Sequence, residues 1–105
     1  MSDLTDRIEA VTTAISNARQ KLLEVKETVI KSKEDLKDIE AYLLPEIVGK
    51  NQAERDANLR MKTENQRRIL WANEMSEHKS SLELELALDA RRSLENIIRI
   101  MELEV

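Results

Sequence analysis

The sequence predicts an all-α protein, built as a long helical hairpin or coiled coil that associates into a helical bundle. Three observations predict this fold class: a heptad repeat of apolar residues, a charged fraction of 36%, and the presence of only one glycine and one proline. Such compositions are typical of long helices with thin apolar cores. With 105 residues, no phenylalanine and only two aromatic side chains, the chain is expected to form a single domain, residues 1–105.

The first predicted helix covers about residues 3–44 and carries the heptad repeat. Alternate steps of four and three residues lead from Leu4 to Leu43, and only Ser32 among these positions is not apolar. The positions are Leu4, Ile8, Val11, Ile15, Ala18, Leu22, Val25, Val29, Ser32, Leu36, Ile39 and Leu43. A repeat sustained over about six heptads indicates a coiled coil. Ser32 is either a tolerated small residue or a polar position that sets the helix register.

Residues 45–50 are expected to connect the two helical arms. Pro45 disfavours helical geometry in the residue before it, so the first helix should end near Leu44. Gly49 is expected to act as a left-handed helix stop. Asn51, followed by Glu54, resembles a capping box, which predicts that the second helix begins at about residue 51.

The second helix is expected to run to about residue 103, either unbroken or with a break near residues 79–81, where Ser80 begins another cap-like segment. An unbroken antiparallel helix would overshoot the first by roughly ten residues, or about 15 Å. The apolar residues of that overshoot would need a second chain to cover them, so we predict a homo-oligomer, most simply a dimer. The residues predicted at its interface are Leu4, Ile8, Val11, Ile15, Leu22, Val25, Leu94, Ile97, Ile98 and Met101.

Several classes of protein are disfavoured by the composition. The absence of cysteine removes disulfides and thiolate chemistry, and no stretch approaches about 18 uncharged apolar residues. The first residues are acidic and do not resemble a signal peptide, so a cytoplasmic location without membrane contact is expected.

No catalytic or metal site is predicted, and no cofactor or small-molecule substrate. The one histidine, His78, lies near Glu74 and Glu77, but a catalytic zinc site needs three protein ligands and is not expected here. The sequence also lacks a glycine-rich phosphate loop and a Ser-His-Asp set. We therefore expect a protein that is not an enzyme.

A basic segment at residues 50–68 is the main feature of the charge pattern. Residues 49–68 carry a net charge of +3, whereas the flanking parts carry −3 and −4. The residues that could contact a partner or nucleic acid are Lys50, Asn51, Arg55, Arg60, Lys62, Arg67, Arg68 and the adjacent Trp71. Phosphate contacts are one interpretation; ion pairs that decorate an exposed helix are the other. Trp71 is interpreted as a core or subunit-interface anchor, a contact for another protein, or a base-stacking platform.

The segment Gly49 to Leu59, GKNQAERDANL, resembles a stretch found in small helical accessory proteins of tailed bacteriophages. The resemblance implies a phage accessory factor that acts on a host or replication protein in the host cytoplasm. From the residues themselves we predict a self-associating helical protein that binds another protein. The alternatives are a nucleic-acid-binding accessory protein that uses residues 50–68, and a structural coiled-coil spacer.

Overall fold

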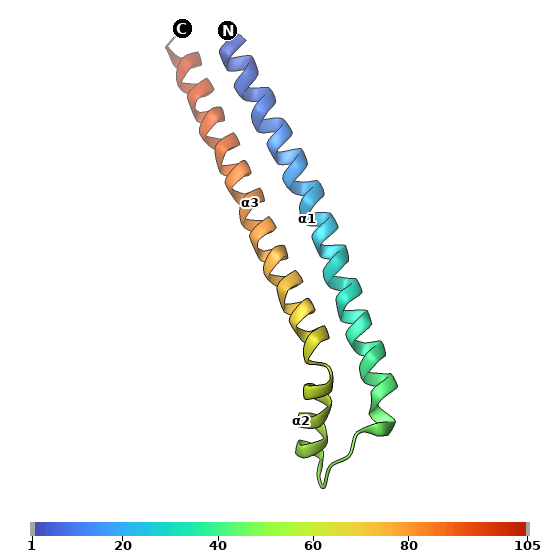
Figure 1. Ribbon diagram of the computed structural model, residues 1–105. Coiled ribbons are helices and arrows are strands. Elements are labelled where there is room, and N and C mark those ends of the chain that lie inside the picture. The colour runs from blue at the N-terminus through green and yellow to red at the C-terminus, as the bar shows by residue number, and fades with distance from the viewer. Residues whose placement is uncertain (1, 105) are drawn as a thin grey trace. The chain divides into compact units, whose positions relative to one another are not determined.

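A computed structural model describes residues 2–104 and confirms an all-α helical hairpin (Figure 1). The elements are α1 (Ser2–Leu43), the short 3-10 helix η1 (Leu44–Glu46), α2 (Gln52–Lys62) and α3 (Glu64–Leu103). The described residues contain no strand. No helix within residues 2–104 is both long enough and apolar enough to cross a membrane.

The chain divides into two compact units, which we name by their place along it. The terminal unit combines residues up to Glu24 with those from His78 onward, and the turn unit is Val25–Glu77. In the terminal unit, Lys21 Nζ lies 3.0 Å from Glu83 Oε2. In the turn unit, Asn73 Nδ2 donates to Ser32 Oγ at 2.6 Å. Arg67 also pairs there with Glu40, which lies later in α1, so α1 and α3 are antiparallel in that unit.

The predicted overshoot of the second helix is not present. α1 contains 42 residues and α3 contains 40, because η1, α2 and the connecting residues take up the extra chain length. Leu94, which was expected to lie beyond the first helix, is only 6% exposed within the chain. The prediction of a dimer can therefore no longer rest on an overshoot that a second chain must cover.

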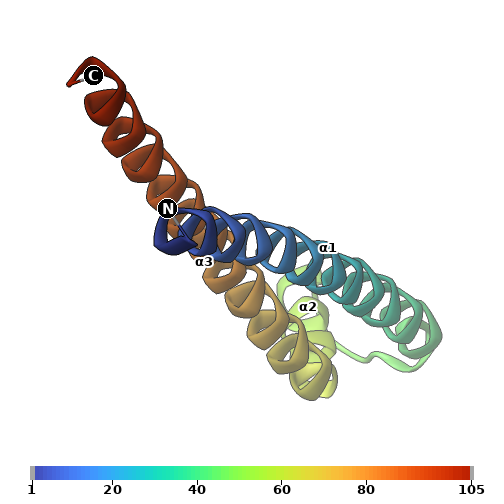
Figure 2. The same cartoon turned by 90° about the horizontal axis from the view of Figure 1, so that it is seen from above.

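The heptad positions of α1 are its most buried face, as the sequence predicts. Ile15 is 5% exposed and Val29 is 4% exposed, and every other heptad position except Ile8 is at least half-buried. In the terminal unit, Figure 2 shows the last turns of α3 diverging from the first turns of α1. This divergence explains why Ile8 and Met101 remain 41% and 48% exposed.

α3 is continuous through residues 79–81, where a break was one of the expectations. Ser80 is 2% exposed, so its small side chain packs inside the unit and does not cap a new helix. The break lies at Thr63 instead, between α2 and α3. The Thr63 hydroxyl donates to the Leu59 carbonyl at 2.8 Å and accepts from Arg67 Nε at 3.1 Å. These bonds hold the fully buried Thr63 at the junction.

The connection confirms two of the sequence expectations and corrects a third. α1 ends at Leu43 with Pro45 in η1, and Asn51 Oδ1 accepts from the Glu54 amide at 2.8 Å to cap α2. The prediction of a left-handed Gly49 is wrong, because no glycine has a positive φ. A Cβ on Gly49 would instead lie 2.7 Å from Arg55 Cγ and 2.8 Å from the Arg55 amide nitrogen. Glycine is needed there because α2 approaches the connection closely.

Candidate protein-interaction surfaces

The basic side chains of residues 50–68 do not form one positive surface. Arg67 Nη2 binds Glu40 Oε1 at 2.7 Å, and Arg68 Nη2 binds Glu64 Oε1 at the same distance. Asn51 is occupied as the cap of α2. Arg67 and Arg68 therefore fit the interpretation of this segment as an ion-paired helix surface, because each pairs with a carboxylate of the same chain.

The remaining basic residues are exposed: Lys50 lies in the connection before α2, and Arg55, Arg60 and Lys62 lie on α2. Arg55 Nη2 donates to Gln52 Oε1 at 3.4 Å, while Lys50, Arg60 and Lys62 have no ion pair among residues 2–104. Arg60 lies roughly 140° around the helix from Arg55, whereas Lys62, seven residues after Arg55, lies on the same side as Arg55. Contact with nucleic acid stays a prediction, and it would rest on the four named cations without a carboxylate partner among the described residues: Lys50, Arg55, Arg60 and Lys62.

Trp71 is 66% exposed on α3 in the turn unit. Its interpretation as a core residue of the single chain is therefore wrong, and contact with another chain or molecule stays a prediction. Met75, one turn later on the same helix, is 48% exposed. A bulky aromatic ring beside a flexible apolar side chain is the composition typical of protein contact surfaces.

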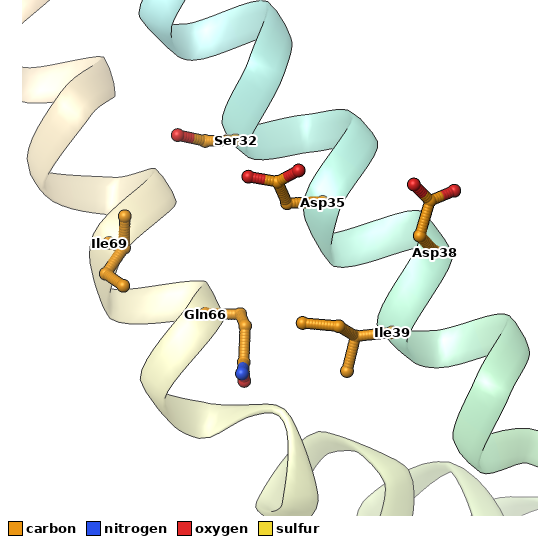
Figure 3. Close-up of a pocket in the computed structure, with 6 residues that line it drawn as sticks. All are labelled: Ser32, Asp35, Asp38, Ile39, Gln66 and Ile69. Carbon is orange, nitrogen blue, oxygen red and sulfur yellow. The ribbon is translucent and has the colours of Figure 1, made fainter.

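A groove in the turn unit lies between α1 and α3 and has a volume of about 260 Å³. Figure 3 shows Ile39 and Gln66 extending into the space between the two helices, while Asp38 points away from α3. The other residues that line the groove are Ser32, Asp35 and Ile69. Gln66 Oε1 is buried without a hydrogen-bond partner among the described residues. The groove therefore combines two isoleucine side chains with the polar side chains of Ser32, Asp35, Asp38 and Gln66.

The ten residues predicted at an interface between copies fall into three classes within one chain. Ile15 and Leu94 are buried; Leu4, Val11, Leu22, Val25 and Ile98 are half-buried; Ile8, Ile97 and Met101 are exposed. Buried side chains already pack inside the chain, so a second copy can reach only the other two classes. The predicted interface as a set stays untested.

Sequence reasoning missed an apolar row on α3 in the terminal unit. Leu82, Leu86, Ile97 and Ile100 are 46%, 69%, 37% and 56% exposed, respectively. Ile97 and Ile98 were both predicted at an interface between copies; within the chain Ile98 is half-buried and Ile97 is exposed. These four residues recur on one side of the helix, so their spacing in the sequence could have revealed the row.

His78 is exposed, and no group of three or more metal-ligating side chains occurs among residues 2–104. The chain matches no protein family, no curated protein and no solved structure. The resemblance of residues 49–59 to phage accessory proteins therefore stays a prediction from the sequence.

Proposed function

We propose that the chain is a non-enzymatic, self-associating helical protein that binds another protein. One observation carries this proposal: among the described residues of the terminal unit, the only buried large apolar side chains are Ile15 and Leu94. The large apolar side chains left exposed there are Ile8, Leu23, Leu82, Leu86, Ile97, Ile100, Met101 and Leu103. Exposed apolar surface of this extent beside so small a buried core is typical of association surfaces.

Two helices form too thin a layer to bury more than one side of each. A helix with apolar residues on several sides is stable in water when other helices cover those sides. Apolar burial contributes about 25 cal/mol per Å², so covering these residues with a second copy favours association. This is the physical reason for proposing an oligomer, in place of the overshoot expected from the sequence.

The mass of the full chain in solution tests self-association. Light scattering at micromolar concentration should give two or more chains, with circular dichroism confirming full helicity. A fully helical particle with the mass of one chain would rule out self-association.

The turn unit supplies the proposed contact with another protein, through Trp71 and Met75. The resemblance of residues 49–59 makes a host or replication protein in a bacterial cytoplasm the class of partner that we propose. Protein is favoured over nucleic acid because Arg67 and Arg68 already bind carboxylates.

Substitution of Trp71 tests this contact. Trp71→Ala should leave the free energy of unfolding within about 0.5 kcal/mol of the wild type, because the side chain is exposed. It should also abolish co-purification of the partner from the cells that produce the protein. Tyr42→Ala is the matched control, since Tyr42 is an aromatic residue of the turn unit that is 78% exposed. Equal retention of the partner by both variants would exclude Trp71 as the contact.

A further inference from the structure

The row formed by Leu82, Leu86, Ile97 and Ile100 lies on one side of α3 in the terminal unit, and we call it the outward row. At about 100° per residue, its four members fall within a sector of roughly 60°. The buried residues Ser80 and Leu94 lie on a different side of the same helix. α3 therefore has a second apolar surface, separate from the one that packs inside the unit.

We infer that this surface binds the same surface of a second copy, with the two α3 helices antiparallel about a two-fold axis. The inference rests on the self-association proposed above and names its surface. When the axis passes beside residues 91 and 92, Leu86 faces Ile97 of the second copy and Leu82 faces Ile100 of the second copy, to within one residue. Each apolar residue of the row then meets another, as a self-complementary interface requires.

The charges beside the row match the same alignment. Glu85 and Arg99 are exposed, lie on the same flank of the row, and have no ion pair among residues 2–104. Antiparallel helices bring equal flanks together, so Glu85 faces Arg99 of the second copy, and the symmetry repeats the pair. In a parallel alignment opposite flanks of the two helices meet, so Glu85 of one copy would not face Arg99 of the other.

A second pair of charges fits at the ends of the contact. Lys79 and Glu104 are exposed, have no ion pair among the described residues, and lie at nearly equal distances from the axis on opposite sides. The antiparallel alignment brings Lys79 toward Glu104 of the second copy. The contact from residue 79 to residue 104 is roughly 39 Å long, which is enough to cover the whole outward row.

Polar residues occupy the middle of the surface and favour this alignment over shifted ones. Asp89 lies between Leu86 and Ile97 on the same side of the helix, and its Oδ1 atom is 3.0 Å from Arg92 Nη1. Sliding one helix by a turn would place this charged pair against an apolar residue. A polar position within an apolar helix contact specifies register in this way.

Charge reversal tests the alignment quantitatively, with sedimentation equilibrium as the measurement. Glu85→Arg and Arg99→Glu should each raise the dimer Kd about tenfold, because each places like charges opposite one another twice. The double variant E85R/R99E should restore the wild-type Kd. Glu102→Arg is the control, because it makes the same charge change at an exposed position of α3 away from the flank, and it should leave the Kd unchanged.

Cysteine cross-linking tests the geometry directly, because the chain has no cysteine of its own. The variant with both Leu86→Cys and Ile97→Cys should form a covalent dimer under mild oxidation. Leu86→Cys alone should not, because the two copies of residue 86 would lie roughly 16 Å apart along the helices.

The outcomes separate this inference from the proposed function. A wild-type chain that stays monomeric overturns both self-association and the surface. If the wild type is an oligomer, but charge reversal at Glu85 and Arg99 leaves its Kd unchanged and the double cysteine variant does not cross-link, only the proposed surface is wrong. A charge-reversal effect that the double variant restores, together with the cross-link, establishes the antiparallel contact.

Discussion

The two units join the same two helices with different kinds of interaction. In the turn unit, hydrogen bonds cross between α1 and α3: Asn73 binds Ser32 at 2.6 Å and Arg67 binds Glu40 at 2.7 Å. The buried apolar residues are Val29 in the turn unit and Ile15 and Leu94 in the terminal unit. The ion pair across the helices there, Lys21 with Glu83, is exposed to solvent. Both units thus bury apolar residues, and the turn unit adds part-buried hydrogen bonds between its two helices.

The difference concerns how strongly each unit defines the alignment of its two helices. Hydrogen bonds are directional and define one alignment, whereas apolar burial depends mainly on area and tolerates several alignments. The turn unit is therefore the part with a defined register and a defined exposed surface around Trp71. The terminal unit is the part in which the proposed self-association would cover exposed apolar side chains such as Leu86 and Ile100.

The largest expected effect tests whether apolar burial stabilises the terminal unit. Leu94→Ala should lower the free energy of unfolding by about 2 kcal/mol, because it removes a buried side chain and leaves a cavity. Leu103→Ala, at 81% exposure on the same helix, should change it by less than about 0.5 kcal/mol. Urea titration at a fixed protein concentration measures both. Equal effects of the two substitutions would contradict the apolar character of this unit.

A smaller effect tests the hydrogen bonds of the turn unit. Thr63→Val keeps the side-chain shape but removes the bonds to the Leu59 carbonyl and to Arg67, and should cost about 1–2 kcal/mol. The matched control is Thr12→Val, because Thr12 makes the same kind of bond to the Ile8 carbonyl at 2.8 Å in an exposed position. Thermal and urea unfolding of the two variants give the comparison. A loss as small as that of the control would show that the junction at Thr63 does not depend on its hydroxyl.

The smallest expected effect concerns a single hydrogen bond between α1 and α3 in the turn unit. Ser32→Ala and Asn73→Leu should each lower the free energy of unfolding by about 1 kcal/mol, because each breaks the Asn73–Ser32 hydrogen bond. The double variant should lose less than the sum of the two, with a coupling energy of at least about 0.5 kcal/mol. A double-mutant cycle measures that coupling. Strict additivity would mean that Ser32 is only a tolerated small residue.

Much of the fold could be predicted because its signals are local. The heptad from Leu4 to Leu43, the helix end before Pro45 and the cap at Asn51 each depend on residues within a few positions of one another. The periodicity of a helix and the geometry of its ends are properties of short segments. The same local reasoning was insufficient at Gly49, because the close atoms there belong to Arg55 in the next helix.

The candidate surfaces were less predictable, because exposure depends on which side of α3 packs. The choice between Ile97 and Ile98 as the inner residue, and the exposure of Trp71, follow from the way α3 rotates against its neighbours within each unit. Apolar residues on several sides of α3 made more than one rotation compatible with the pattern. The sequence therefore showed the spacing of the outward row, but it did not show whether that side of α3 is buried or exposed.

The sequence alone determined that the chain is all-α, where its first helix ends and which side of that helix is buried. Only the tertiary structure decided that the second arm breaks at Thr63, that Arg67 binds Glu40, and that Asn73 is the partner of Ser32. The last two pairs are separated by 27 and 41 residues along the chain. No local pattern encodes such distances, because the partners meet only when the antiparallel helices have taken their final register.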